Sequence, residues 1–196
     1  MHNYATNSEE RRFVPFFLAM AAVGLGIATT WFLGLWHFDL PWWAPPLDTM
    51  TYYGLLYWWF DEVLWKWQPL RSVGLVRVPI LAGKWMGRVV PASAAGVQQA
   101  ADIDVVVMIR QTWQQIRIDV STTHSKSKSL SASLTLDGEA VLSYEYANEP
   151  LPSAPSTMHA HRGGARLMLS ADNRLVGDYY SGRDRQSFGT IDLGRA

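Results

Sequence analysis

Residues 110–136 read RQTWQQIRIDVSTTHSKSKSLSASLTL, and the pattern in this stretch decides the fold of the C-terminal part. Apolar Ile116, Ile118 and Val120 alternate with polar residues, and after a polar turn at 123–125 a second run alternates leucine or alanine with serine or threonine. Alternation with a period of two is typical of β-strands, because successive side chains point to opposite faces. One face of the hairpin is apolar and the other is rich in hydroxyls, so it does not suit a parallel sheet buried on both sides. The stretch therefore predicts a β-hairpin in a curved antiparallel sheet.

The remainder of the C-terminal part continues this pattern, with short alternating segments separated by turn residues and without a helical period. A meander of this kind has two unpaired edges unless it closes on itself. We therefore expect an all-β fold, a small up-and-down eight-stranded antiparallel β-barrel whose interior can hold one small ligand. Trp85 in the sequence GKWMG is expected to plug one end, and the proline-containing segment 148–159 is expected to be a loop. The strands are expected at residues 84–90, 103–111, 115–121, 128–136, 140–146, 160–169, 174–180 and 188–193.

The N-terminal third has a different solvent preference. Residues 13–36 are uncharged, and about 20 apolar residues suffice to cross the hydrocarbon core of a bilayer. Residues 47–67 are also largely apolar but carry acidic residues near both ends. We expect two transmembrane helices that form a hairpin, and the alternative for the second is a helix lying in the interface. The expected domains are a hairpin at 1–67 with spans at about 13–36 and 47–67, a linker at 68–82 and a cytosolic barrel at 83–196.

Positive charge flanks the expected hairpin on both outer sides, whereas the connecting segment 37–46 contains neither Lys nor Arg. Loops rich in Lys and Arg remain in the cytosol. Both termini are therefore expected in the cytosol, in a multi-pass protein of the bacterial inner membrane. The flanking cations are Arg11, Arg12, Lys66, Arg71 and Arg77.

The charge and cysteine content exclude several classes of function. The formal net charge is zero, so the composition gives no indication of binding to a DNA or RNA polymer, which would need a basic face. The chain has no cysteine, so disulfides and thiolate metal sites are excluded. His124, His159 and His161 lack the spacing of a metal site, and we expect neither a metal nor a cofactor. No catalytic motif occurs, so an enzyme is not expected.

Aromatic and polar side chains recur where a nucleotide could bind. Tyr144, Tyr146 and Asn148 alternate along one predicted strand and therefore share a face. Aromatic rings stack on bases, and a guanidinium holds a phosphate through two parallel hydrogen bonds. The alternating serines of residues 125–133 form a hydroxyl row that would either bind a polar ligand or face water. The alternative for the tyrosines is a ladder of cross-strand pairs beside solvated arginines. A further aromatic and cationic group consists of Tyr179, Arg183 and Arg185.

The order of these features is similar to that of a family of bacterial defence effectors. They are the SMODS-associating two-transmembrane, β-strand-rich effectors of CBASS anti-phage systems, also called CD-NTase-associated protein fifteen. The resemblance covers nearly the whole chain, because it includes the membrane hairpin as well as motifs along the barrel. These motifs are GKWMG (83–87), QTW (111–113), the serine row that follows Thr122, YEYANEP (144–150), MHAHRG (158–163) and GDYYSGRDR (177–185).

The resemblance implies a receptor and not a catalyst. In such systems a nucleotidyltransferase, the CD-NTase, makes a cyclic oligonucleotide, the barrel of the effector binds it, and the inner membrane is disrupted so that the infected cell dies. We expect a cyclic dinucleotide as ligand, the lipid bilayer as a partner and a homo-oligomer on activation. The motifs add residues to those chosen from the strand pattern. The candidate ligand contacts are Gln111, Trp113, Thr122, Ser125, Ser127, Tyr144, Tyr146, Asn148, His161, Tyr179, Arg183 and Arg185.

Two other functions are compatible with the pattern. Barrels of this size also carry lipids or small hydrophobic ligands, as lipocalins do, and such a carrier needs an interior lined by apolar side chains. The other alternative function is that of a barrel with a filled core that only mediates oligomerisation.

Overall fold

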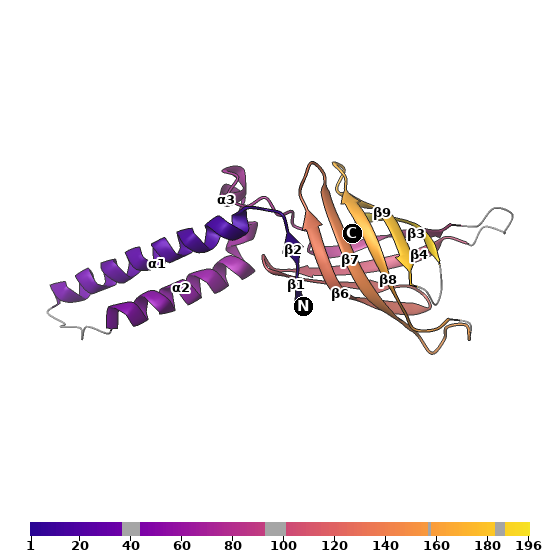
Figure 1. The fold of residues 1–196 in the computed structure, drawn as a ribbon, viewed down its shortest axis with the longest axis horizontal. Coiled ribbons are helices and arrows are strands. Elements are labelled where there is room, and N and C mark those ends of the chain that lie inside the picture. Colours follow the sequence, from indigo (N-terminus) through magenta and orange to yellow (C-terminus); the bar gives the residue numbers. More distant parts are fainter. Residues whose placement is uncertain (37–43, 93–100, 157, 183–186) are drawn as a thin grey trace. The chain divides into compact units, whose positions relative to one another are not determined.

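A computed structural model describes residues 1–36, 44–92, 101–156, 158–182 and 187–196, with the side chains of 44–47 left out (Figure 1). The chain forms two compact units, which we describe separately. One consists of residues 8–77 and is helical; the other combines residues 1–7 with residues 78–196 and is a β-barrel. The seven N-terminal residues thus belong with the barrel, and not with the helices to which the sequence pattern assigned them.

Eight of the described strands form a closed antiparallel barrel, which confirms the predicted fold (Figure 1). Neighbours in sequence pair with one another, β10 pairs with β3, and β5 pairs with β6, so the ring is complete. The second and third strands of the predicted series, β4 and β5, have the bounds expected from their alternation. The strands are β3 (Gly83–Pro91), β4 (Ile103–Gln111), β5 (Gln115–Ser121), β6 (Ser125–Thr135), β7 (Ala140–Pro150), β8 (His161–Leu169), β9 (Arg174–Ser181) and β10 (Phe188–Arg195).

Two further strands were not predicted. β1 (His2–Asn3) pairs antiparallel with β5, and β2 (Ala5–Thr6) pairs parallel with β6. Each has two residues, which is too short for a periodic pattern to be recognised.

The serine row of β6 does not lie on one face. Ser125 and Ser127 are buried, but a β-bulge between Ser129 and Ser131 shifts the register. Beyond the bulge Leu134 is buried instead, because one extra residue reverses which side chains point inward. The prediction of a continuous hydroxyl face was therefore wrong. The prediction that 148–159 is a loop was also wrong at its start, since β7 continues to Pro150, which pairs with Ser125.

Apolar side chains fill one end of the barrel. Trp85 is 0% exposed, and its indole Nε1 donates a hydrogen bond to the Leu81 carbonyl oxygen at 2.9 Å. The Arg195 guanidinium lies 5.5 Å from the centre of the Trp85 ring, a cation–π contact. The expected plugging role of Trp85 is confirmed. Other buried apolar side chains of the barrel include Val107, Ile109, Ile116, Ile118, Leu134, Leu142, Leu167, Leu175 and Leu193.

Gly87 permits close contact between β3 and β10. A Cβ at this position would overlap the carbonyl oxygen of Asp192, an atom of the backbone that cannot rotate away. We expect Gly87→Ala to lower the free energy of unfolding by about 1–3 kcal/mol, as overpacking typically does. Gly194→Ala on the paired strand is the matched control, because its nearest atom would be Met86 O at 3.9 Å. Equal unfolding midpoints in urea for the two variants would contradict this account.

The helical unit contains α1 (Glu10–Leu35), α2 (Ala44–Glu62), the 3-10 turn η1 (Leu64–Lys66) and α3 (Gln68–Ser72). α1 and α2 contact each other through small and hydroxyl-bearing residues. A Cβ at Gly26 would lie 2.6 Å from Thr49 Oγ1, and the hydroxyls of Thr29 and Tyr52 are 2.7 Å apart. α2 ends at Glu62, five residues before the predicted end of the second span at 67. The predicted loop 37–46 lies largely outside the described residues.

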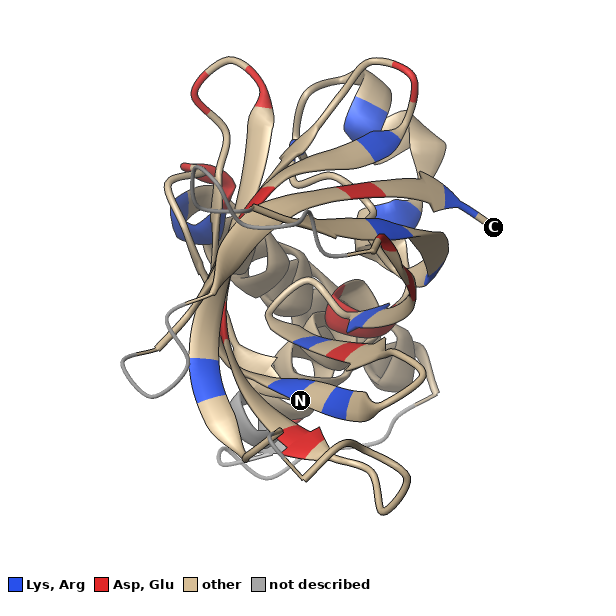
Figure 2. Ribbon diagram, turned by 90° about the vertical axis from the view of Figure 1, so that its right-hand side faces the viewer, with Lys and Arg blue, Asp and Glu red and all other residues tan. Residues whose placement is uncertain are grey.

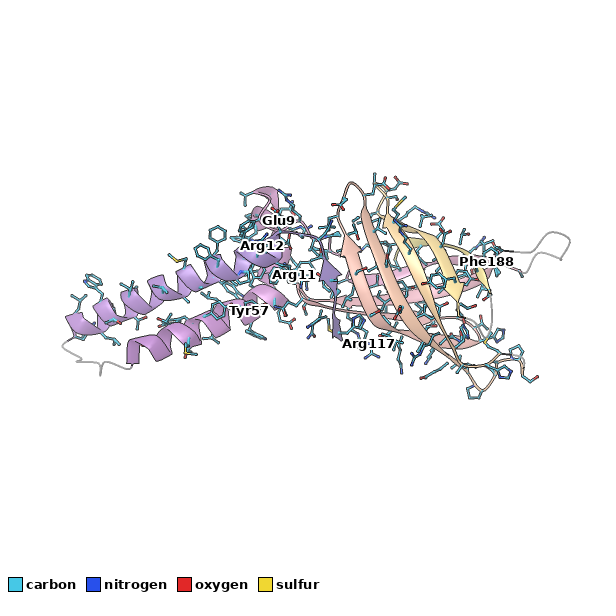
Figure 3. The ribbon with its side chains drawn as sticks, in the orientation of Figure 1. Glu9, Arg11, Arg12, Tyr57, Arg117 and Phe188 are labelled. Carbon is cyan, nitrogen blue, oxygen red and sulfur yellow. The ribbon has the colours of Figure 1, made fainter. Side chains whose placement is uncertain are left out.

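α1 is long and apolar enough to cross a membrane, and it is the one helix of the described residues that meets this test. Its exposed surface carries large apolar side chains such as Phe16, Ile27 and Trp31. The cations Arg11 and Arg12 lie at its first turn (Figure 3). These features indicate that the chain associates with a membrane through α1.

Candidate functional site

The end of the barrel away from Trp85 contains a cavity of about 140 Å³. It lies at the level where β3 ends and β4 begins, and each strand from β3 to β10 contributes at least one lining residue. Apolar, aromatic and hydroxyl-bearing side chains line it together. They are Val89, Ile103, Val120, Thr122, His124, Ser125, Ser127, Tyr144, Tyr146, Asn148, Met158, His161, Tyr179, Ser187 and Ile191.

Most of the sequence-predicted ligand contacts meet in this cavity. They come from four separate segments of the chain, which only closure of the barrel brings together. The predicted residues that line it are Thr122, Ser125, Ser127, Tyr144, Tyr146, Asn148, His161 and Tyr179.

Gln111 and Trp113 are buried elsewhere in the barrel and do not line this cavity. The Gln111 side-chain oxygen accepts hydrogen bonds from the backbone N–H groups of Leu81 and Ala82, at 2.7 and 3.2 Å, and its nitrogen donates to a backbone carbonyl. Gln111 therefore anchors the segment that enters the barrel. Trp113 is buried, and its carbonyl oxygen accepts a hydrogen bond from Tyr4 at 2.8 Å. Arg183 and Arg185 lie outside the described residues.

Asn148 is the buried polar group of the cavity with an unused donor. The residue is 5% exposed, and its Oδ1 accepts a hydrogen bond from the Ser127 hydroxyl at 2.8 Å. Its Nδ2 is buried and has no hydrogen-bond partner among the residues that the structure describes. Leaving such a donor unpaired costs about 1–3 kcal/mol, so a ligand acceptor placed here would recover this free energy.

Tyrosines form the aromatic side of the cavity. The rings of Tyr144 and Tyr146 have centroids 6.2 Å apart, and the His161 ring lies 6.4 Å from that of Tyr146. Gly163, on β8, provides the space for Tyr146, since a Cβ there would overlap the tyrosine ring. Burial, with a smaller contribution from Tyr146, raises the pKa of Tyr144 above its usual value. Tyr144 therefore stays neutral at physiological pH and keeps its hydroxyl proton available for donation.

Hydroxyl groups mark the turn between β5 and β6. Thr122 Oγ1 lies 3.1 Å from Ser125 Oγ and accepts hydrogen bonds from the backbone N–H groups of His124 and Ser125. These bonds hold the two hydroxyls at the cavity in one arrangement. Together with Ser127 they make part of the cavity lining polar.

Sequence reasoning missed several lining residues. Alternation shows that Val89, Val120 and Ile191 point inward, but it does not show whether an inward residue reaches the packed end or the cavity. Met158 and Ser187 come from segments between strands and carry no strand pattern.

The described lining contains neither Lys nor Arg, and His124 and His161 are its basic side chains. Along the ribbon of the barrel, Lys and Arg are interspersed with Asp and Glu (Figure 2). Arg174 and Asp192, on neighbouring strands, form an outward ion pair at 2.6 Å. Within the ranges that the structure describes, no cluster of three or more potential metal ligands occurs.

The barrel is packed at one end and has a cavity of aromatic and polar side chains at the other. This arrangement is typical of β-barrels that bind a small ligand. Comparison with known families identifies which family of ligand-binding barrels this chain belongs to. The family described as "Cap15, cyclic dinucleotide receptor domain" matches residues 76–195, and the chain belongs to this family. This confirms the resemblance found in the sequence, and the matched residues include the whole cavity.

One curated relative is "CD-NTase-associated protein 15" from Yersinia aleksiciae. It is 32% identical over 144 residues, which are 71% of this chain and 65% of the relative. The match thus spans slightly less than two thirds of the relative's length.

Proposed function

We propose that this protein is a CBASS effector whose barrel binds a cyclic dinucleotide made by a CD-NTase. Binding triggers oligomerisation of the membrane helices, loss of inner-membrane integrity and death of the infected cell. The protein acts in this proposal as a receptor and not as an enzyme. The observation that carries it is the buried Asn148 amide nitrogen, which lacks a partner among the described residues and lies in an aromatic cavity of a cyclic dinucleotide receptor domain.

The chemistry of the cavity suits a nucleobase. Base rings stack on tyrosine faces, while the carbonyl oxygens and ring nitrogens of bases accept hydrogen bonds. Tyr144 and Tyr146 supply aromatic surface, and the Nδ2 of Asn148 supplies a donor. The hydrocarbon chain of a lipid in the cavity would leave this donor unpaired, because it has no hydrogen-bond acceptor. The carrier function therefore receives less support from the site.

The size of the cavity limits how a ligand can enter. Its volume of about 140 Å³ is below the roughly 300–1,000 Å³ of pockets that enclose a drug-sized ligand. We infer that one base enters the cavity and that the rest of the cyclic dinucleotide lies at the mouth. Arg183 and Arg185 remain our candidates for the phosphates there, since a guanidinium is suited to bidentate phosphate contacts.

We also propose that the helical unit is a membrane hairpin and that both termini of the chain lie in the cytosol. α2 carries Asp48, Asp61 and Glu62, so its composition alone does not define a span. Its contacts with α1 through Gly26 and Thr29 support insertion of the two helices as a pair. The outer surface of α2 exposes apolar side chains, including Met50, Leu55 and Trp58.

A ligand can change the assembly of the helices only by binding one state of the protein better than another. The full chain in detergent micelles is expected to bind at least one cyclic dinucleotide saturably, in calorimetric titrations with every pairing of adenine, guanine and uracil. The same nucleotide added to vesicles that contain the protein and an entrapped dye is expected to release the dye.

Linear dinucleotides of the same bases are the control ligands, because they offer the bases without the cyclic phosphate frame. Absence of heat for every cyclic dinucleotide would overturn the receptor function. Lipid retained by the purified protein and detected by mass spectrometry, together with that absence, would favour the carrier. Binding without dye release would retain the receptor and remove the proposed membrane effect.

A further inference from the structure

The N-terminal segment fills a gap in the barrel wall. β5 and β6 form three residue pairs, from Asp119–Lys128 to Ser121–Lys126, and then separate. Residues 1–7 lie between the separated strands, with β1 paired to β5 and β2 paired to β6 (Figure 1). We call residues 1–7 the strap.

Side chains fasten the strap at two points. Tyr4 is 3% exposed; its hydroxyl donates a hydrogen bond to the Trp113 carbonyl oxygen at 2.8 Å. Asn7 makes two hydrogen bonds at the far end: its Oδ1 accepts one from the Leu136 N–H at 2.9 Å, and its Nδ2 donates one to Asp137 Oδ1 at 2.7 Å. The ladders themselves contribute two residue pairs each, so these side chains provide much of the attachment.

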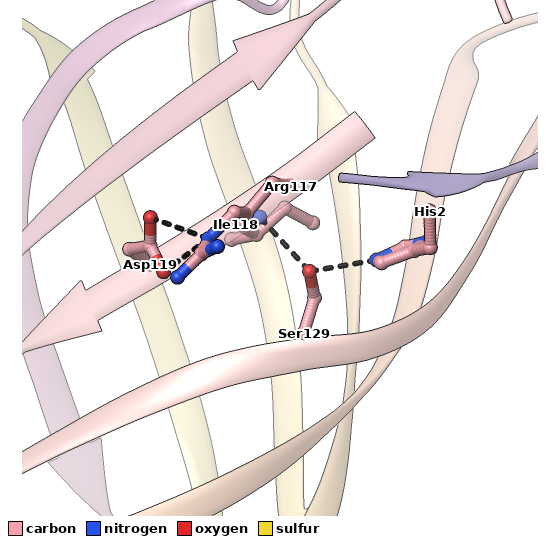
Figure 4. Close-up of polar contacts among 5 residues, drawn as sticks. All are labelled: His2, Arg117, Ile118, Asp119 and Ser129. Atoms are coloured by element: carbon pink, nitrogen blue, oxygen red, sulfur yellow. Dashed lines mark hydrogen bonds and ion pairs between the residues drawn. The ribbon is translucent and has the colours of Figure 1, made fainter. Parts of the chain in front are cut away.

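Ser129 lies where β5 and β6 separate (Figure 4). Its Oγ accepts a hydrogen bond from the Ile118 N–H at 2.9 Å and is 2.8 Å from His2 Nε2. One hydroxyl therefore joins β5, β6 and the strap. The bulge that follows Ser129 belongs to the same junction, and bulges commonly redirect a side chain in this way.

The junction is close to the cavity along β6. Ser127, two residues before Ser129, lines the cavity and donates its hydroxyl hydrogen to Asn148 Oδ1. Residues two positions apart in a strand lie on the same face, so Ser127 and Ser129 occupy successive inward positions. On its other side the strap is covalently continuous with the membrane helix, since Ser8 and Glu9 alone separate it from the first residue of α1.

We propose that the strap couples the cavity to the start of α1, and that a bound cyclic dinucleotide and a docked strap stabilise each other through β6. The inference rests on the proposed function. The ligand and the strap order the same part of β6, so whichever binds first lowers the entropy cost for the other. Such coupling is reciprocal: a ligand that favours the docked strap binds less tightly when the strap is released. Attachment through short ladders makes docking a local equilibrium that a ligand can shift.

The test uses the full chain in detergent micelles, the same panel of cyclic dinucleotides and hydrogen–deuterium exchange. The amides of residues 2–7 are expected to exchange more slowly when the nucleotide is bound. Tyr4→Ala and Asn7→Ala are expected to weaken nucleotide binding about fivefold or more, which is the lower range of allosteric coupling. Asn3→Ala is the matched control, because Asn3 is exposed and its side chain makes no hydrogen bond in the described structure.

The outcomes separate the coupling from the receptor function. If wild type and both strap variants bind the nucleotide equally tightly, or if exchange in residues 2–7 does not respond, the coupling is overturned and the receptor stands. If the wild type binds no cyclic dinucleotide, the receptor function is overturned and the coupling with it. Ser129→Ala compared with Ser131→Ala gives an independent readout, because Ser129 contacts the strap and Ser131 bonds to Glu145. If the nucleotide slows exchange at the strap in wild type and in Ser131→Ala but not in Ser129→Ala, the result would support the coupling.

Discussion

Trp85→Ala is expected to lower the free energy of unfolding of the barrel by about 3–5 kcal/mol, as truncation of a large buried side chain does. The side chain is 0% exposed, so its removal leaves a cavity among the packed leucines and isoleucines. It also removes the partner of the Leu81 carbonyl oxygen and the ring that contacts Arg195. Hydrogen exchange of the β3 and β10 amides measures this loss for the barrel alone, and it should accelerate by at least about 100-fold.

Phe188→Ala is the control for Trp85→Ala. Phe188 is also aromatic and lies in the barrel, but it is 60% exposed at the start of β10 (Figure 3). Its truncation is expected to change stability by less than about 0.5 kcal/mol, as surface substitutions do. Similar acceleration of exchange in both variants would show that Trp85 does not fill the packed end in the way described.

Asn148→Asp is expected to weaken cyclic dinucleotide binding by at least about tenfold, which corresponds to roughly 1.4 kcal/mol. The aspartate has nearly the same shape and can still accept the hydrogen bond from Ser127. It replaces the unpaired Nδ2 donor by an oxygen and adds negative charge, both unfavourable toward the acceptor oxygens of a base or phosphate. Asn148→Ala removes the donor without adding charge, and its expected loss is smaller. Calorimetric titration of each full-length variant measures these affinities.

Ser133→Ala is the matched control within the serine row. Ser133 follows the bulge in β6 and lies outside the cavity lining, whereas Ser127→Ala removes the group that orients Asn148. We expect normal affinity for Ser133→Ala and reduced affinity for Ser127→Ala. Unchanged binding in both Asn148 variants would place the nucleotide outside this cavity.

Local patterns predicted the barrel strands because inward and outward side chains alternate along each of them. The alternation of Ile116, Ile118 and Val120 identified β5 with its observed bounds, and the same holds for β4. A closed barrel followed from the need to pair the edges of the meander. The tyrosines and Asn148 of β7 were also assigned correctly to one face, since no bulge interrupts them.

Other features depended on contacts between distant parts of the chain. The bulge after Ser129 has no signal in a run of alternating serines, so the split of the serine row was not predicted. Gln111 and Trp113 have the chemistry of ligand contacts, but they lie among packed residues. The strap pairs with residues more than a hundred positions away, and its two-residue strands carry no period.

The sequence by itself determined the strand pattern, the apolar helix, the family and most of the residues that line the cavity. These properties reside in the spacing and the chemistry of neighbouring residues, which a single chain displays directly. The tertiary structure alone decided which inward residues pack and which line the cavity, where β6 changes register, and where residues 1–7 bind. The reason is physical: depth along a barrel and the filling of a gap are set by strand pairing, and pairing joins residues that are far apart in sequence.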